Sequence, residues 1–131
     1  MKDPTPDITE VITSVEAALN YLGATDPEVI IYNKILPVFK DEPENHLLNY
    51  QTAVVLIRAI NEKKEPDWDS NESKYYNYFI MGSSGFRFGV CVHWTTASSV
   101  GSRLCFFQPN HGRHLVEKFP DVFKNFMLIN K

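Results

Sequence analysis

Hydrophobic and polar residues alternate most clearly over residues 86–94, where every second residue is aromatic or β-branched. Successive side chains of a strand point to opposite faces, so the pattern predicts a strand with one core face and one polar face. The predicted core face carries Phe86, Phe88, Val90, Val92 and Trp94, and the predicted polar face carries Arg87, Gly89, Cys91, His93 and Thr95.

Two further aromatic runs flank this strand, at residues 74–82 and 101–107. Turn-forming segments at 83–85 and 98–101 separate the three runs, which is typical of an antiparallel meander. A sheet covered on both faces would read as continuous apolar runs, so we expect one open face. The sequence therefore predicts an α+β fold, with helices before and after a three-stranded antiparallel meander and packed on one face of it.

Apolar residues at spacings of three and four predict the strongest helix, from residue 44 to about residue 63. A stripe this wide is typical of a helix that faces the core, and we expect it to pack on the core face of the central strand. The stripe contains Leu47, Tyr50, Val54 and Ile57, is widened by Leu48, Val55 and Ala59, and has Leu56 at its margin.

Capping and breaking residues predict where the other helices begin and end. Thr13 and Glu16 fit a capping box, with an earlier start at Asp7 as the alternative, and Gly23 suits the position just after a helix. Pro27 suits the first turn of a second helix. Pro120 predicts that the C-terminal helix is kinked or broken.

The length of 131 residues is that of one ordinary domain, and we expect a single α+β domain over residues 1–131, with residues 1–12 frayed or extended. No apolar run approaches the roughly 20 residues that cross a bilayer, and the first residues lack the apolar stretch of a secretory signal. We therefore expect a cytoplasmic protein with no membrane partner. Cys91 and Cys105 are expected to be free thiols, although a bridge between adjacent strands is the alternative.

The net charge of −3 hides a marked asymmetry along the chain. Residues 1–72 carry 6 Lys and Arg against 14 Asp and Glu, a net charge of −8, whereas residues 73–131 carry 7 against 2, a net charge of +5. One interpretation is that the two halves attract each other within the domain. The other is that the basic half binds an anionic partner.

Single-stranded nucleic acid is the sharpest candidate for such a partner. The basic half holds 12 of the 17 aromatic residues, and sheets that bind single strands combine aromatic stacking with Lys and Arg contacts to the backbone. The overall acidic charge argues against strong binding, because phosphate contacts dominate affinity. The candidate nucleic-acid residues are Arg87, His93, Arg103, Tyr76 and Tyr78.

Metal or nucleophilic chemistry receives less support from the residue spacings. Cys91, His93, Cys105, His111 and His114 are the candidate ligands, but close Cys or His pairs of the zinc type are missing. A Cys nucleophile with His93 as its base is chemically possible, yet no Asp or Glu lies in the strands to orient that histidine. We therefore predict no catalytic residue, no metal site and no cofactor, and keep a small Cys/His enzyme as an alternative.

Several segments together resemble a family of small uncharacterised proteins encoded in prophages and mobile elements of gut bacteria. The similarity rests on AINEKKEPDWDSNESKYYNYF at 59–79, GSRLCF at 101–106 and the terminal FKNFML, and covers most of residues 45–131. Ile60, Lys63-Lys64 and Phe107 depart from the family pattern. The family has no assigned activity, so the resemblance implies the order of elements and a phage-like origin, but no reaction.

These observations favour a non-enzymatic binding protein whose unidentified partner is another protein. Five acidic residues in the polar connection after the long helix form the candidate protein-interaction patch. Self-association through an exposed edge strand is a further possibility. The acidic residues are Glu62, Glu65, Asp67, Asp69 and Glu72.

Overall fold

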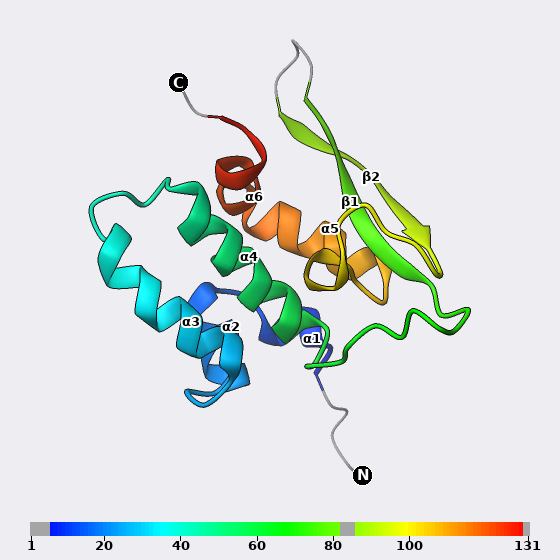
Figure 1. Ribbon diagram of the computed structural model, residues 1–131, viewed down its shortest axis with the longest axis horizontal. Coiled ribbons are helices and arrows are strands. Elements are labelled where there is room, and N and C mark those ends of the chain that lie inside the picture. The colour runs from blue at the N-terminus through cyan, green and yellow to red at the C-terminus, as the bar shows by residue number, and fades with distance from the viewer. Residues whose placement is uncertain (1–5, 82–85, 130–131) are drawn as a thin grey trace.

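The computed structural model describes residues 6–81 and 86–129, in which a group of helices lies beside a small antiparallel sheet (Figure 1). None of the helices in these residues is long and apolar enough to cross a membrane. In chain order the elements are α1 (Ile8–Val11), α2 (Val15–Leu22), α3 (Pro27–Ile35), the 3₁₀ helix η1 (Leu36–Phe39), α4 (His46–Ile60), β1 (Lys74–Ile80), β2 (Arg87–Trp94), the 3₁₀ helix η2 (Ser102–Leu104), α5 (Pro109–Lys118) and α6 (Pro120–Met127).

Two short helices, α1 and α2, come first among the described elements. The prediction that residues 1–12 are frayed or extended is therefore wrong from residue 8 onward. Asp7 caps α1, and its carboxylate accepts a hydrogen bond from the Thr9 backbone N–H at 2.9 Å. Ser14, not Thr13, caps α2, because its hydroxyl accepts from the Ala17 N–H. Ile12, between the two helices, is fully buried and holds them on the core.

Other helix boundaries follow the local signals in the sequence. Gly23 ends α2 with a φ of +90°, a backbone conformation that glycine adopts without steric cost. Pro27 is the first residue of α3, where a missing N–H costs nothing. Pro120 separates α5 from α6, which confirms the predicted break in the C-terminal helix.

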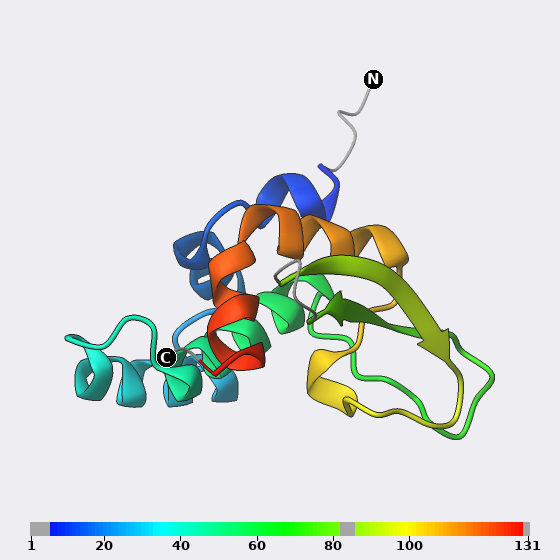
Figure 2. The ribbon, with the colours of Figure 1, turned by 90° about the horizontal axis from the view of Figure 1, so that it is seen from above.

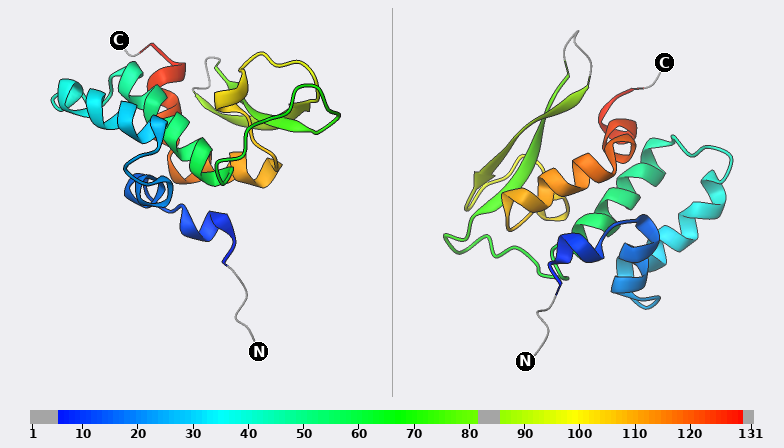
Figure 3. Two further views of the ribbon diagram at one scale, coloured as in Figure 1. Left: turned by 60° about the horizontal axis from the view of Figure 1, so that its bottom comes forward. Right: turned by 180° about the vertical axis from the view of Figure 1, so that it is seen from behind.

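Helix α4 is the centre of the helical layer, with α3 on one side and α5 and α6 on the other (Figure 3). Almost every residue from Gln51 to Ile60 is buried, because α4 has neighbours all round. Leu56, placed by the sequence pattern at the margin of the stripe, is fully buried, whereas Leu47 is 55% exposed. The expected packing of this helix on the sheet is wrong, since its main contacts are with α2, α3 and α6.

Helix α5 is the helix that lies on the sheet (Figure 2). The Asn77 amide of β1 donates a hydrogen bond to the Gly112 carbonyl oxygen at 3.1 Å. A Cβ atom at Gly112 would lie 2.5 Å from Asn77 Oδ1, so a larger residue there would force the Asn77 side chain to move. Because residue 112 has no side chain, α5 and β1 pack closely enough to form this hydrogen bond.

The sheet has two strands, β1 and β2, and the predicted third strand at 101–107 is wrong. Gly101, with a φ of +78°, leads into η2 instead. Cys105 and Phe106 are both buried, and the Asn61 amide donates to the Cys105 carbonyl oxygen at 2.9 Å. Of residues 101–107, only Phe106 pairs with β1; its partner is Tyr75, on the edge of β1 that faces away from β2. Asn61, at the end of α4, thus holds Cys105 from the side away from β1, while Ser102–Leu104 form η2 instead of extended backbone.

A β-bulge changes which residues of β2 share a face. The backbone pairs Tyr78 with Val90 but Phe79 with Phe88, so Gly89 is an extra residue on β2. Because alternation restarts at the bulge, the predicted single core face over residues 86–94 is wrong. His93 was predicted on the face opposite to Phe88. In the structure it contacts Tyr75, which lies on the same face of the sheet as Phe79 and Phe88. The predicted turn at 83–85 and the side chains of Arg87, Val90, Cys91, Val92 and Trp94 lie outside the described part.

The second face of the sheet is covered at one end and exposed at the other. Lys74 is only 1% exposed, and its ammonium group donates to the carbonyl oxygens of Ser70 and Thr95. The ring of Trp68 lies 5.1 Å from the Lys74 nitrogen, a cation–π geometry. Tyr78, four residues farther along the same face, is 58% exposed.

We expect His111 of α5 to make the fold less stable in acid. It is 7% exposed, Nδ1 has no partner among the described residues, and burial lowers its pKa while Asp7 and Glu62 oppose that shift and His114 adds to it. The native protein therefore binds fewer protons at His111 than the unfolded chain does. The contribution of His111 to the free energy of unfolding is fully present above a pH of about 6.5, the ordinary pKa of histidine, and is lost as the pH falls below that value.

Urea unfolding at pH 7.5 and pH 5.5 measures this loss, and His111→Leu should make it smaller. His93→Leu, at an exposed position, is the matched control and should leave the loss unchanged. A loss of equal size in wild type and His111→Leu would contradict the expectation.

Candidate functional site

The outer edge of β1 is left open where a third strand would lie. Tyr75 donates its N–H to Phe106 at 2.7 Å and accepts from the Phe106 N–H at 2.6 Å, so its backbone groups point away from β2. Backbone groups of alternate residues in a strand point the same way, so those of Asn77 and Phe79 also point outward. Within residues 6–81 and 86–129, no backbone hydrogen bond is made to these outward groups.

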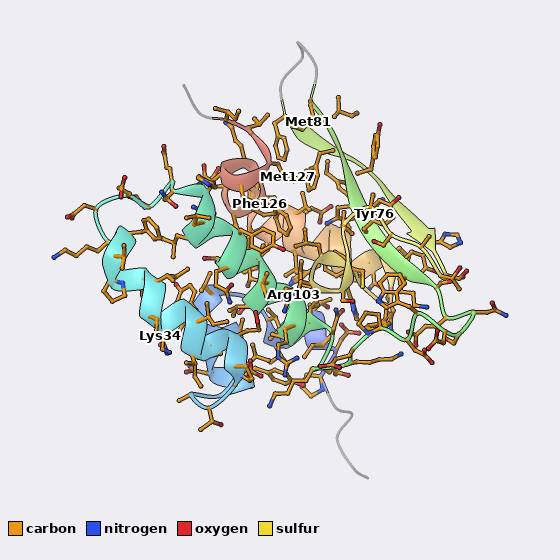
Figure 4. All side chains as sticks on the ribbon, in the orientation of Figure 1. Lys34, Tyr76, Met81, Arg103, Phe126 and Met127 are labelled. Carbon is orange, nitrogen blue, oxygen red and sulfur yellow. The ribbon has the colours of Figure 1, made fainter. Side chains whose placement is uncertain are left out.

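A narrow apolar groove of about 30 Å³ runs along this open edge. Figure 4 shows Tyr76 on β1 and Phe126 and Met127 on α6, on either side of the groove. Met127 is 39% exposed and Tyr78, farther along the strand, is 58% exposed, so apolar surface continues beyond the groove. The groove is lined by Ile57, Tyr76, Asn77, Phe79, Val100, Leu104, Phe106, Phe123, Phe126 and Met127.

Aromatic contacts hold α6 at a fixed distance from β1. The Phe79 ring lies 5.9 Å from that of Phe123, and Phe123 lies 5.8 Å from Phe126. Tyr50 of α4 meets Phe126 edge to face at 5.5 Å. Such contacts favour offset or perpendicular rings and restrict movement of the helix. The two walls of the groove are therefore set before any partner arrives.

The structure does not bring the candidate nucleic-acid residues onto one surface. Tyr76 and Tyr78 share one face of β1, whereas His93 contacts Tyr75, which faces the other way. Arg103 lies on η2, with its Nε atom 4.0 Å from Glu28 of α3, in a separate cleft. The side chain of Arg87 lies outside the described part.

Some acidic residues of the polar connection form ion pairs or hydrogen bonds with other residues of the same connection. Glu72 pairs with Lys64 at 2.6 Å, and this hydrogen bond is the main cause that lowers the pKa of Glu72. The Asp67 carboxylate accepts from the Asp69 N–H at 3.0 Å and so forms a local turn. Glu65 lines the same cleft as Arg103, and Glu62 lies in the turn that follows α4.

The candidate metal and nucleophile residues are dispersed. No group of three His, Cys, Asp or Glu side chains in the described residues is placed to hold a metal ion. Phe106, next to Cys105, pairs with β1 on one edge, while the Cys91 backbone pairs with β1 on the other, so the two cysteines do not lie on adjacent strands. Burial raises the pKa of the Cys105 thiol to about 11, so that the thiol is protonated at neutral pH. His114 is tied by its ring nitrogen to the Ile12 carbonyl oxygen at 2.9 Å.

The residues of α6 that border the groove were not among the predicted site residues. Phe126 and Met127 read in the sequence as the apolar side of a short helix, which is ordinarily buried. Only the absence of a third strand exposes them beside the edge of β1. No local pattern carries that information, because it depends on where residues 101–107 pack.

The chain matches no protein-family model, no curated protein and no solved structure.

Proposed function

We propose that this protein is a non-enzymatic binding protein that takes an extended segment of another protein as an added strand on β1. The open edge at Asn77 and Phe79, beside an apolar groove, is the observation that carries this proposal. Added strands gain affinity from backbone hydrogen bonds and specificity from pockets for alternate side chains. The edge supplies the first, and the groove, with a volume of only about 30 Å³, supplies a shallow apolar contact surface for the second.

The groove restricts the chemistry of the bound segment. Its walls are almost entirely apolar, so every second side chain of the segment should be aliphatic or aromatic where it passes Phe126 and Met127. The side chains between them should be polar, because they face solvent near Tyr78. Asn77, Tyr78 and Phe79 carry no charge that would repel an incoming strand.

A single extended chain suits this site better than a second copy of the protein. The edge of β1 is bordered by α6 on one side and by η2 on the other. A second copy would bring its own α6 along with its own edge, and the two helices would compete for the same space. Light scattering during gel filtration tests this point, and we expect a monomer.

Amide hydrogen exchange tests whether the edge is open. In the free protein, Tyr76 and Tyr78 pair with β2, so we expect their amides to exchange at least about tenfold more slowly than those of Asn77 and Phe79. Equal protection at all four positions would mean that the edge is already paired, and the proposal would fail.

Selection of displayed random 12-residue peptides on the purified protein supplies a defined ligand. We expect selected peptides to alternate apolar and polar residues and to protect the Asn77 and Phe79 amides when bound. Met127→Lys should weaken them at least about tenfold, because it places a charge in the groove. Leu36→Lys, at a position of similar exposure in η1, is the matched control. Peptides that bind Met127→Lys and wild type equally would place the site elsewhere.

Two parts of the sequence interpretation remain predictions. Single-stranded nucleic-acid binding gains no support from the positions of Arg103, His93 and the tyrosines. The phage-like origin implied by the resemblance over residues 45–131 is compatible with a binding role but identifies no partner.

A further inference from the structure

A second hollow lies on the other side of η2 and shares Ile57 and the η2 wall with the groove. This cleft has a volume of about 390 Å³, in the range of sites for small ligands. Pro27 and Pro66 contribute exposed apolar surface, whereas Val54 and Ile57 of α4, each 2% exposed, form the floor beneath. Figure 4 shows Arg103 of η2 lying against α4.

Charged groups from three segments converge on the cleft but nearly cancel. Arg58 of α4 pairs with Asp26 at 2.9 Å, and Arg103 of η2 lies 4.0 Å from Glu28. Lys64 pairs with Glu72, and Glu65 adds another carboxylate to the lining. A balanced site of this kind does not favour a polyanion such as nucleic acid. A ligand with a single anionic group meets less repulsion.

Arg58 is held in the orientation that such a group requires. Its Nε donates to both Asp26 oxygens, at 3.1 and 2.9 Å, which fixes the plane of the guanidinium group. Its two Nη atoms make no hydrogen bond within residues 6–81 and 86–129, although the side chain is 26% exposed and lines the cleft. A pair of free Nη atoms is the usual partner of a carboxylate bound through both oxygens.

Asn61 provides a second unsatisfied polar group at the same place. It lines the cleft, is 8% exposed, and uses its amide nitrogen on the Cys105 carbonyl oxygen. Its Oδ1 atom has no hydrogen-bond partner in the described part of the chain. A buried acceptor of this kind costs free energy unless a donor reaches it. Because this atom has almost no exposed surface, a ligand in the cleft reaches it only if the Asn61 side chain moves.

We propose that the cleft binds the terminal carboxylate of an apolar amino acid, either free or as the last residue of a peptide. The carboxylate is held by the Nη atoms of Arg58, and the guanidinium group of Arg103, 68% exposed, lies at the same cleft and adds a second positive charge. The apolar side chain lies against Pro27 and Pro66, above the floor formed by Val54 and Ile57.

Isothermal titration with matched small ligands tests this proposal. N-acetyl-L-leucine carries the carboxylate, and N-acetyl-L-leucinamide has the same shape without the charge. We expect the acid to bind at least tenfold more tightly than the amide. L-leucine and the peptide Ala-Ala-Leu distinguish the two sources, because only a site for peptide ends prefers the peptide. Equal binding of acid and amide, or no binding of any carboxylate at millimolar concentration, would overturn the proposal.

Arginine variants locate the binding. Arg58→Lys keeps the charge and a partner for Asp26 but loses the paired Nη atoms, so we expect at least a tenfold loss of affinity with the thermal midpoint close to that of wild type. Arg103→Ala, at an exposed position, should weaken binding severalfold. Lys34→Ala on α3 is the control and should bind as wild type does. If Arg58→Lys and Arg103→Ala both bound N-acetyl-L-leucine like wild type, the ligand would not be in this cleft.

Discussion

Leu56→Asp is expected to unfold the protein at room temperature, whereas Leu47→Asp on the same helix should change the free energy of unfolding by less than about 0.5 kcal/mol. Leu56 is fully buried at the centre of the helical layer, and Leu47 is 55% exposed in the first turn of α4. Loss of the leucine side chain costs about 2–5 kcal/mol, and an unpaired buried carboxylate adds several more. A domain is stabilised by only about 5–15 kcal/mol in total.

The two substitutions discriminate between the sequence pattern and the structure. The sequence pattern placed Leu47 in the apolar stripe and Leu56 at the margin of the stripe. It therefore predicts that Leu47→Asp is more destabilising than Leu56→Asp, the opposite of what the structure predicts. An aspartate at position 47 also lies near the N-terminus of α4, where a negative charge is favourable. Circular dichroism with urea titration measures both variants. A Leu56→Asp protein that unfolded at the wild-type urea concentration would show that α4 is not central.

Asp26→Ala is expected to lower the free energy of unfolding by roughly 3–5 kcal/mol. The Asp26 side chain is only 3% exposed and has two roles. It caps α3 by accepting from the Glu28 N–H at 3.0 Å, and it accepts both hydrogen bonds from Arg58 Nε. Alanine would leave the cap empty and a guanidinium group without its partner in a confined site.

Two further variants separate the cap from the charge pair. Asp26→Asn retains a capping oxygen but removes the charge, so its loss should lie between those of wild type and Asp26→Ala. Ser14→Ala removes the exposed cap of α2 and should cost only about 1 kcal/mol. If Asp26→Ala and Ser14→Ala proved equally destabilising in urea, the pair with Arg58 would contribute nothing measurable.

One short segment forms a wall of both proposed sites. Val100 and Leu104 line the groove beside β1, and Ser102 and Arg103 line the cleft beside α4. Ser102, Arg103 and Leu104 were expected to form part of the third strand, and Val100 the turn before it. Had they done so, the edge of β1 would be paired and Arg103 would lie on the sheet. The departure from a regular sheet is therefore what creates both surfaces.

Local interactions made much of the helical part predictable. Gly23, Pro27 and Pro120 act on backbone torsions and hydrogen bonds within about four residues, so their effect is the same in any fold. The two regular strands were predictable for a similar reason, because aromatic and β-branched residues favour extended backbone. The α+β class follows from these elements, since helices and a sheet with one apolar face must cover each other.

The number of strands, the register of the sheet and the sites were decided only by tertiary packing. Residues 101–107 have the composition of a strand, but Ser102–Leu104 form η2, which packs on α4. The bulge at Gly89 depends on how β2 meets Tyr78, not on the alternation within β2. Arg103 faces Glu28 because η2 packs on α4. Each outcome is a competition between contacts far apart in the chain, and a local pattern holds no information about which contact is more favourable.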